Sequence, residues 1–181
     1  MASSRLVLGL EFSTQSAKIV VLDLVNKSLV LKEKFVYEEV FPNYKTIQGV
    51  LPHLNPEIRH TEPLMIIDSL EHAFEMLKWK GINLSTIETI KLDAMQHCTI
   101  YLSQETQSVL KTLNPIYSLT RQIEPLLTRK TAPIWEDRST HQETAWLTAQ
   151  FPNNSLAKLT ANRPEMRFPA AQILRWGKEN P

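Results

Sequence analysis

A polar stretch near the start of the chain has the residue types and spacing that phosphate binding uses. Glu11-Phe12-Ser13-Thr14-Gln15 separates two apolar runs, which predicts a short turn between two strands. Such a turn can present backbone N–H groups and hydroxyls to a phosphate. The carboxylate of Glu11, just before the turn, is placed to hold a metal ion or a water molecule. Hairpins of this kind are common and most bind nothing, so the stretch by itself is a weak signal.

A second polar pair interrupts an apolar region in the middle of the chain. Gln96 and His97 follow the run 87–94, which predicts a buried strand, and a further strand is expected over 99–103. Side chains at strand ends in α/β sheets line ligand clefts. Gln and neutral His each offer a donor and an acceptor, which suits sugar hydroxyls. The alternative is that His97 only packs and hydrogen-bonds within the fold.

A third segment, Pro133–Thr140, combines an aromatic ring with charged side chains. A short strand over 133–135 would deliver Trp135, Asp137 and Arg138 to the start of a helix. Asp137 could accept hydrogen bonds from vicinal hydroxyls beside the apolar ring face. Asp137 or Ser139 would also make a good helix N-cap, and taken alone the segment favours that interpretation.

The strands and helices around these three segments decide where the segments lie in the fold. Closely spaced alternating runs predict an antiparallel meander of three strands, at residues 6–12, 17–24 and 29–37. A long irregular connection is expected over 38–62. Apolar residues at helical spacing and the positions of Pro and Gly predict helices at 64–80, 118–129, 140–150, 155–159 and 168–179. Three strands, a helix and another strand indicate a mixed α/β sheet.

The composition is that of an ordinary globular domain. The chain has 181 residues, 43% hydrophobic and 22% charged, with a net charge of +1, which argues against nucleic acid or an anionic membrane as a partner. A single cysteine allows no internal disulfide, and the start does not read as a signal peptide, so a cytoplasmic location is expected. The four glycines form neither a dinucleotide-binding fingerprint nor a P-loop. The oligomeric state stays open.

Taken together and in order, four segments resemble the FGGY family of carbohydrate kinases, most closely its eukaryotic xylulokinase branch. Leu8–Gln15 is similar to that branch's D-F-S-T-Q segment, with Glu11 in place of Asp. Met95–Tyr101 is similar to Q-Q-H-G-S-[IV]-Y, and Pro133–Thr140 to P-V-W-x-D-x-S-T. Leu159–Phe168 is similar to L-T-G-x-R…R-F. The resemblance covers essentially the whole chain.

The resemblance implies an RNase-H-like fold of the actin and hexokinase ATPase type. Residues 1–181 would form the N-terminal, sugar-binding part of the first kinase domain, with the second, nucleotide-binding domain absent. It also implies transfer of phosphate from ATP, with Mg²⁺, to a ketopentose, converting D-xylulose to D-xylulose 5-phosphate in pentose metabolism.

The resemblance assigns roles to particular residues. The phosphate-binding residues would be Ser13, Thr14, Gln15 and Lys18, although Lys18 could equally be an exposed strand residue. Glu11 would be the acid beside Mg²⁺. The sugar-binding residues would be Gln96, His97, Asp137 and Arg138. No catalytic residue is expected in this chain, since the family's base would lie beyond Pro181.

Several residues depart from the family pattern. Glu11 is one methylene longer than Asp, and a misplacement of about 1 Å can cost on the order of 100-fold in rate. Ala94 and Cys98 stand where the family has glycines, and Met95 replaces a polar residue. These departures are compatible with an altered substrate or with a degenerate copy that has lost catalysis. Because the family's base would lie beyond Pro181, we expect this chain alone to be inactive. The alternatives are a pseudokinase or sugar-binding regulatory module, or an inactive truncated product.

Overall fold

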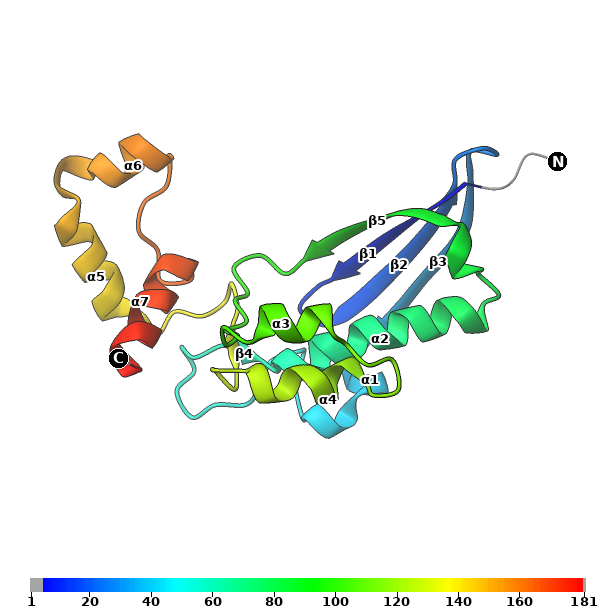
Figure 1. Ribbon diagram of the computed structural model, residues 1–181. Coiled ribbons are helices and arrows are strands. Elements are labelled where there is room, and N and C mark those ends of the chain that lie inside the picture. The colour runs from blue at the N-terminus through cyan, green and yellow to red at the C-terminus, as the bar shows by residue number, and fades with distance from the viewer. Residues whose placement is uncertain (1–4, 181) are drawn as a thin grey trace.

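The computed structural model describes residues 5–180 and contains a twisted four-stranded sheet (Figure 1). Its strands are β1 (Leu6–Phe12), β2 (Ser16–Asp23), β3 (Ser28–Val36) and β5 (Ile87–Ala94). Their order is β3-β2-β1-β5, with β1 and β5 parallel and the other pairs antiparallel. The predicted meander and mixed sheet are confirmed.

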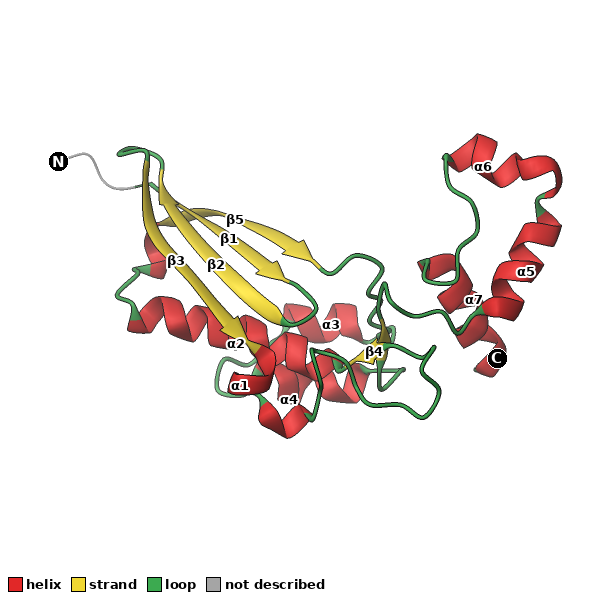
Figure 2. Cartoon of the chain, turned by 180° about the vertical axis from the view of Figure 1, so that it is seen from behind, coloured by secondary structure: helices red, strands yellow, loops and turns green. Residues whose placement is uncertain are grey.

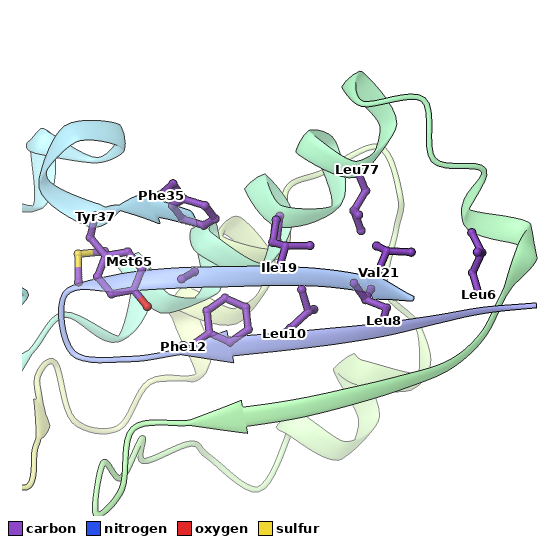
Figure 3. Packing of buried hydrophobic residues seen from close by; sticks show 12 residues of the cluster. Leu6, Leu8, Leu10, Phe12, Ile19, Val21, Phe35, Tyr37, Met65 and Leu77 are labelled. Atoms are coloured by element: carbon purple, nitrogen blue, oxygen red, sulfur yellow. The ribbon is translucent and has the colours of Figure 1, made fainter. Parts of the chain in front are cut away.

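Alternation along the strands buries one face of this sheet. Every second residue of β1 is buried, and the same holds for the middle of β2. Figure 3 shows these side chains beneath α2 (Pro63–Trp79), which contributes Met65 and Leu77. Since apolar burial is the main favourable term in folding, this layer stabilises the frame that carries the first turn.

The helix α2 begins and ends where its sequence signals lie. Pro63 occupies its first turn, and the Glu62 carboxylate accepts from the N–H of Leu64 at 3.3 Å. Gly81, with a φ of +77°, follows its end. The predicted helix 64–80 is confirmed with bounds shifted by one residue.

The connection after β3 is less irregular than predicted. It contains the helix α1 (Tyr37–Val40) and the two-residue strand β4 (His60–Thr61). The strand β4 pairs antiparallel with β6 (Ala132–Pro133), which corresponds to the short strand predicted at 133–135.

Two predictions about the middle of the chain are wrong. Residues 99–103 form no strand, and only Leu102 makes an isolated bridge, to Leu127. The strand β5 exists but is exposed rather than buried, because within residues 5–180 it is an edge strand and α2 packs over β1 and β2. The apolar side chains of β5 stay exposed because none of the described helices packs over them as α2 packs over β1 and β2.

The difference in burial between strands predicts a difference in mutational cost. Ile19→Val in β2 should lower the free energy of unfolding by about 1 kcal/mol, because the lost methylene leaves a gap in packed core. Ile90→Val in β5 should change it by less than about 0.5 kcal/mol, as expected for a surface site. Ile19 is 0% exposed and Ile90 is 48% exposed. Urea denaturation of both variants checks this, and equal losses would contradict the packing described.

The remaining helices lie below and beside the sheet. Two short ones, α3 (Thr106–Lys111) and α4 (Leu119–Ile123), precede the strand β6, and α4 begins the helix predicted at 118–129. Short 3-10 helices occur at Pro42–Tyr44, Leu84–Thr86, Glu124–Leu126 and Pro152–Asn154. Within residues 5–180, each helix is too short or too polar to span a bilayer.

The last three helices form a group at one end of the molecule (Figure 2). They are α5 (His141–Gln150), α6 (Ser155–Thr160) and α7 (Pro169–Glu179), close to the predicted bounds. The group is joined to the sheet by the segment that carries Trp135 and Asp137, so the way this segment folds decides where the helices lie.

Candidate functional site

The turn between β1 and β2 holds a compact polar cluster. The N–H of Ser13 donates to the carbonyl of Ser16 at 3.0 Å, which closes the turn. Lys18 Nζ donates to both oxygens of Glu11, at 2.8 and 3.0 Å, because the two residues are directly paired across β1 and β2. The Ser13 hydroxyl donates to the same carboxylate.

These contacts decide what Glu11 can do. Hydrogen bonds from Lys18, followed by the one from Ser13, hold the pKa of the Glu11 carboxyl below its ordinary value. The carboxylate therefore stays ionised but already faces a cation. Within residues 5–180, no group of three His, Cys, Asp or Glu side chains is arranged to hold a metal ion. The residues present do not fit an ion bound directly by Glu11.

A hollow of about 260 Å³ opens in front of the turn. We call it the turn hollow. Glu11, Ser13 and Thr14 line it from the first segment, Gln96 from the second and Trp135 from the third. The indole N–H of Trp135 donates to the Thr14 hydroxyl at 3.1 Å, across 121 residues of chain. The structure thus brings together parts of all three chemically informative segments, whereas Gln15 and Lys18 do not line the hollow.

His97 points to a different place from its neighbour Gln96. Its φ of 58° lies in the left-handed region, which is uncommon for a residue with a side chain. The imidazole packs on the ring of Phe168, with 4.8 Å between ring centroids, in a mainly apolar hollow of about 520 Å³ among α5, α6 and α7. Burial, and then the charge of Arg167, lower the pKa of His97, so the ring is neutral near pH 7.

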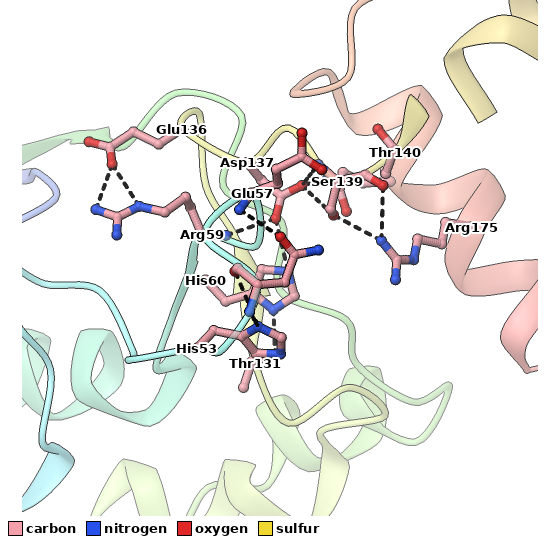
Figure 4. A network of polar contacts seen from close by, with 12 residues as sticks. His53, Glu57, Arg59, His60, Thr131, Glu136, Asp137, Ser139, Thr140 and Arg175 are labelled. Atoms are coloured by element: carbon pink, nitrogen blue, oxygen red, sulfur yellow. Dashed lines mark hydrogen bonds and ion pairs between the residues drawn. The ribbon is translucent and has the colours of Figure 1, made fainter. Parts of the chain in front are cut away.

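Asp137 lies in the interior, at the centre of a network drawn in Figure 4. It is 0% exposed and lines neither the turn hollow nor the apolar hollow beside His97. One oxygen accepts from the N–H of Arg59 at 3.0 Å and contacts His60 Nε2 at 3.3 Å. The other accepts from the N–H and hydroxyl of Ser139, at 3.0 and 2.8 Å, and from Gln172 Nε2 in α7 at 2.6 Å.

This network changes the role that the sequence suggests for Asp137. Burial alone would raise its pKa, but the hydrogen bonds from His60, Arg59 and Ser139 outweigh burial and hold the pKa well below its ordinary value. Neither Asp137 nor Ser139 is the N-cap of α5, whose N-cap position is Thr140. The carboxylate instead ties together β4, its own turn and α7.

Arg138 lies in a third hollow, of about 760 Å³, beside the turn hollow. We call it the arginine hollow. Arg59 and Arg167 also line it, and Arg59 is ion-paired with Glu136 at 2.9 Å. Trp135 lines both hollows, so its ring forms a wall between them. Arg59 lies in the connection predicted to be irregular and belongs to no motif, so no signal in the sequence marks it.

The predicted sugar-binding residues are therefore divided. Gln96 lies in the turn hollow and Arg138 in the neighbouring arginine hollow. His97 faces the helical group and Asp137 is enclosed. As sugar-binding residues, His97 and Asp137 would have to face one pocket, and they do not: His97 lines the hollow among the last three helices, and protein donors surround the Asp137 carboxylate.

The sequence of the chain is similar to those of known sugar kinases. No protein-family model matches the chain. It is 31% identical over 177 residues to the xylulose kinase of Schizosaccharomyces pombe, covering 96% of this chain and 31% of that protein. It is 30% identical over 170 residues to xylulose kinase 2 of Arabidopsis thaliana, covering 93% of this chain and 30% of that protein. The chain resembles the N-terminal part of a xylulose kinase of the FGGY family. It spans about a third of the length of these relatives.

Solved structures agree on the fold. The xylulose kinase of Rhodospirillum rubrum superposes with a TM-score of 0.67 at 17% identity, covering 97% of this chain and 29% of that one. The gluconate kinase of Lactobacillus acidophilus gives 0.68 at 15% identity, covering 98% and 29%. The fold is therefore part of the sugar-kinase fold of the actin and hexokinase ATPase type, as the sequence resemblance implied.

Proposed function

We propose that this chain is the N-terminal portion of an ATP-dependent sugar kinase that phosphorylates D-xylulose to D-xylulose 5-phosphate. On this proposal residues 1–181 belong to the first kinase domain. The observation that carries the proposal is the turn hollow, where the phosphate-like turn, Gln96 and Trp135 meet. The similarity to xylulose kinases over 96% of the chain supports it.

The phosphate side of the proposed site is the first turn. The hydroxyls of Ser13 and Thr14 and the backbone N–H groups of the turn would face the phosphates of ATP. Lys18 would act from behind the turn by neutralising Glu11, because a bare carboxylate there would repel phosphate. Phosphoryl transfer depends mainly on alignment and charge neutralisation, and this geometry supplies part of both.

The sugar side would use the two hollows on either side of Trp135. The indole ring offers an apolar face to the carbon skeleton of a ketopentose, while Gln96 and Arg138 offer hydrogen bonds to its hydroxyls. We assign Asp137 a positioning role rather than a direct contact, since protein donors already surround both of its oxygens. His97 would pack behind Gln96.

Mg²⁺ would enter with the nucleotide rather than on a site built by this chain. Mg²⁺ keeps several waters and is commonly held by substrate phosphates with one or two carboxylates. Glu11 is engaged by Lys18 and Ser13, so we route no step through an ion on Glu11.

A second candidate is a sugar-binding module that transfers no phosphate. The ion pair between Glu11 and Lys18 favours it, because this pair occupies the carboxylate that the family resemblance places beside the metal. The two candidates share the sugar site and differ in whether the chain, or a longer protein containing it, forms ADP in the presence of sugar.

Calorimetric titration of the chain with D-xylulose, and separately with Mg-ATP, tests the proposal. Trp135→Ala should weaken D-xylulose binding at least about tenfold, the equivalent of about 1.4 kcal/mol, by removing the wall of both hollows. Trp146→Ala is the matched control, because Trp146 is similarly exposed, at 48% against 41%, and lines neither hollow. Absence of binding of both ligands to the unmodified chain would refute the proposed function. Sugar binding without ATP binding would favour the second candidate.

A further inference from the structure

The segment that follows β3 donates hydrogen bonds to the turn between β1 and β2. Tyr37 is fully buried, and its hydroxyl donates to the carbonyl of Ser13 at 3.1 Å. Its backbone N–H donates to the carbonyl of Gln15, also at 3.1 Å. Two carbonyl oxygens of the turn, which carry partial negative charge and would repel a phosphate, are therefore held by Tyr37.

A second support comes from a tight turn at Ile47–Val50. Ile47 and Val50 exchange both backbone hydrogen bonds, at 2.8 and 3.1 Å. The two residues between them, Gln48 and Gly49, have φ values of 53° and 77°, as a mirror-image hairpin turn requires. The N–H of Gly49 donates to the Glu38 carboxylate at 3.1 Å, which anchors this turn to α1.

Gly49 fits against Thr14 so closely that no side chain can replace its hydrogen. A Cβ atom at Gly49 would lie 1.7 Å from the carbonyl oxygen of Thr14 and 2.7 Å from its carbonyl carbon. These are backbone atoms, so they could give way only if the first turn itself moved. Thr14 is also the residue whose hydroxyl holds the indole of Trp135.

We propose that Tyr37 and Gly49 are positioning residues that shape the first turn for phosphate. Tyr37 holds the carbonyls of Ser13 and Gln15, and Gly49 leaves the room that the Thr14 carbonyl occupies. The hydroxyls of Ser13 and Thr14 consequently stay at the turn hollow, in register with Trp135. This inference rests on the proposed function, in which the turn binds the phosphates of ATP.

The decisive comparison is Gly49→Ala against Gly81→Ala. Both glycines have a φ of +77°, but a Cβ at Gly81 would meet nothing within 4 Å. The two variants therefore carry the same backbone strain, and only one displaces the turn. Gly49→Ala should weaken Mg-ATP binding at least tenfold in calorimetry while leaving D-xylulose binding within twofold. Gly81→Ala should change neither affinity. A general loss of stability would lower both affinities, so it can be told apart from a local effect on the first turn.

A second readout does not depend on nucleotide binding. The indole N–H resonance of Trp135, assigned by its disappearance in Trp135→Phe, reports the hydrogen bond to Thr14. We expect it to shift in Gly49→Ala and to stay unchanged in Gly81→Ala. An unshifted resonance in folded Gly49→Ala would overturn the inference even if the chain bound no ATP, whereas a shift without ATP binding would refute only the proposed function.

Tyr37→Phe tests the hydrogen bond from Tyr37 to the first turn. It also provides an independent test of the proposal if Gly49→Ala does not fold. It removes one hydroxyl and leaves the backbone N–H of Tyr37 on Gln15. ATP binding should weaken several-fold, with D-xylulose binding unchanged and the Trp135 resonance shifted. Wild-type ATP affinity together with an unshifted resonance would overturn the role assigned to Tyr37.

Discussion

Replacing Asp137 with asparagine should lower the free energy of unfolding by about 3–5 kcal/mol, as breaking a buried, hydrogen-bonded charge does. Asparagine keeps the shape of the side chain but turns one acceptor oxygen into a donor. That donor would face the N–H groups of Arg59 or Ser139, or Gln172. Chemical denaturation measures the loss, and limited proteolysis near α7 should accelerate with it.

Asp93→Asn is the matched control for this substitution. Asp93 is exposed, and the hydrogen bond it accepts comes from the N–H of Ala94, the next residue. Its replacement should change the unfolding free energy by less than about 0.5 kcal/mol. A loss below about 1 kcal/mol in Asp137→Asn would contradict the role of the network in docking α7, since even one unsatisfied buried group costs about that much.

The same network predicts a pH dependence. The pKa of Asp137 is lower in the folded chain than the value of about 3.9 in an unfolded one. The carboxylate therefore contributes its full stability above about pH 4, and this contribution is lost as the pH falls toward the folded pKa. Between pH 4 and pH 2 the unmodified chain should lose stability more steeply than Asp137→Asn. Parallel curves would contradict the assignment.

Removing the ammonium of Lys18 should have the largest effect on nucleotide binding. Lys18→Met leaves the Glu11 carboxylate without its partner, directly behind the turn that we propose binds phosphate. We expect Mg-ATP affinity to fall at least about tenfold, or about 1.4 kcal/mol. The unfolding free energy should change by no more than about 1 kcal/mol, because the pair is partly exposed.

Two further variants separate this local effect from a general change of charge. Lys34→Met removes the same charge from the exposed residue paired with Lys18 in β3, at a side chain that makes no contact with Glu11. It should leave ATP affinity within about twofold, because Lys34 is exposed and its charge is screened by solvent and salt, whereas Lys18 is hydrogen-bonded to Glu11. The double variant Glu11→Gln with Lys18→Met should recover most of the affinity. An unrecovered double variant would show that Lys18 contacts phosphate directly.

Local signals in the sequence were sufficient for the frame of the molecule. Alternation with a period of two predicts the meander, and Pro63 with Gly81 brackets α2, because these patterns reflect the geometry of single elements. The exposure of β5 did not follow from its apolar residues. Whether Ile90 and Leu92 are covered depends on which element packs over them, and α2 packs elsewhere.

The candidate site likewise has features that local sequence signals predict and features that depend on packing between distant segments. The residue types of the first turn, and the order of the four motifs, were enough to identify the sugar-kinase resemblance and its phosphate-like turn. The divergence of Gln96 and His97 depends on a single left-handed φ, which residue type only weakly favours. The enclosure of Asp137 depends on a donor from α7, 35 residues further along the chain.

The amino-acid sequence by itself determined the meander, the main helices and the resemblance to sugar kinases, since each resides in short runs of neighbouring residues. Only the tertiary structure decided which polar groups face a hollow and which face one another. That choice is made by contacts between distant segments, such as Trp135 with Thr14 and Gly49 with the same turn. Such contacts arise from the packing of whole elements, and no local pattern encodes them.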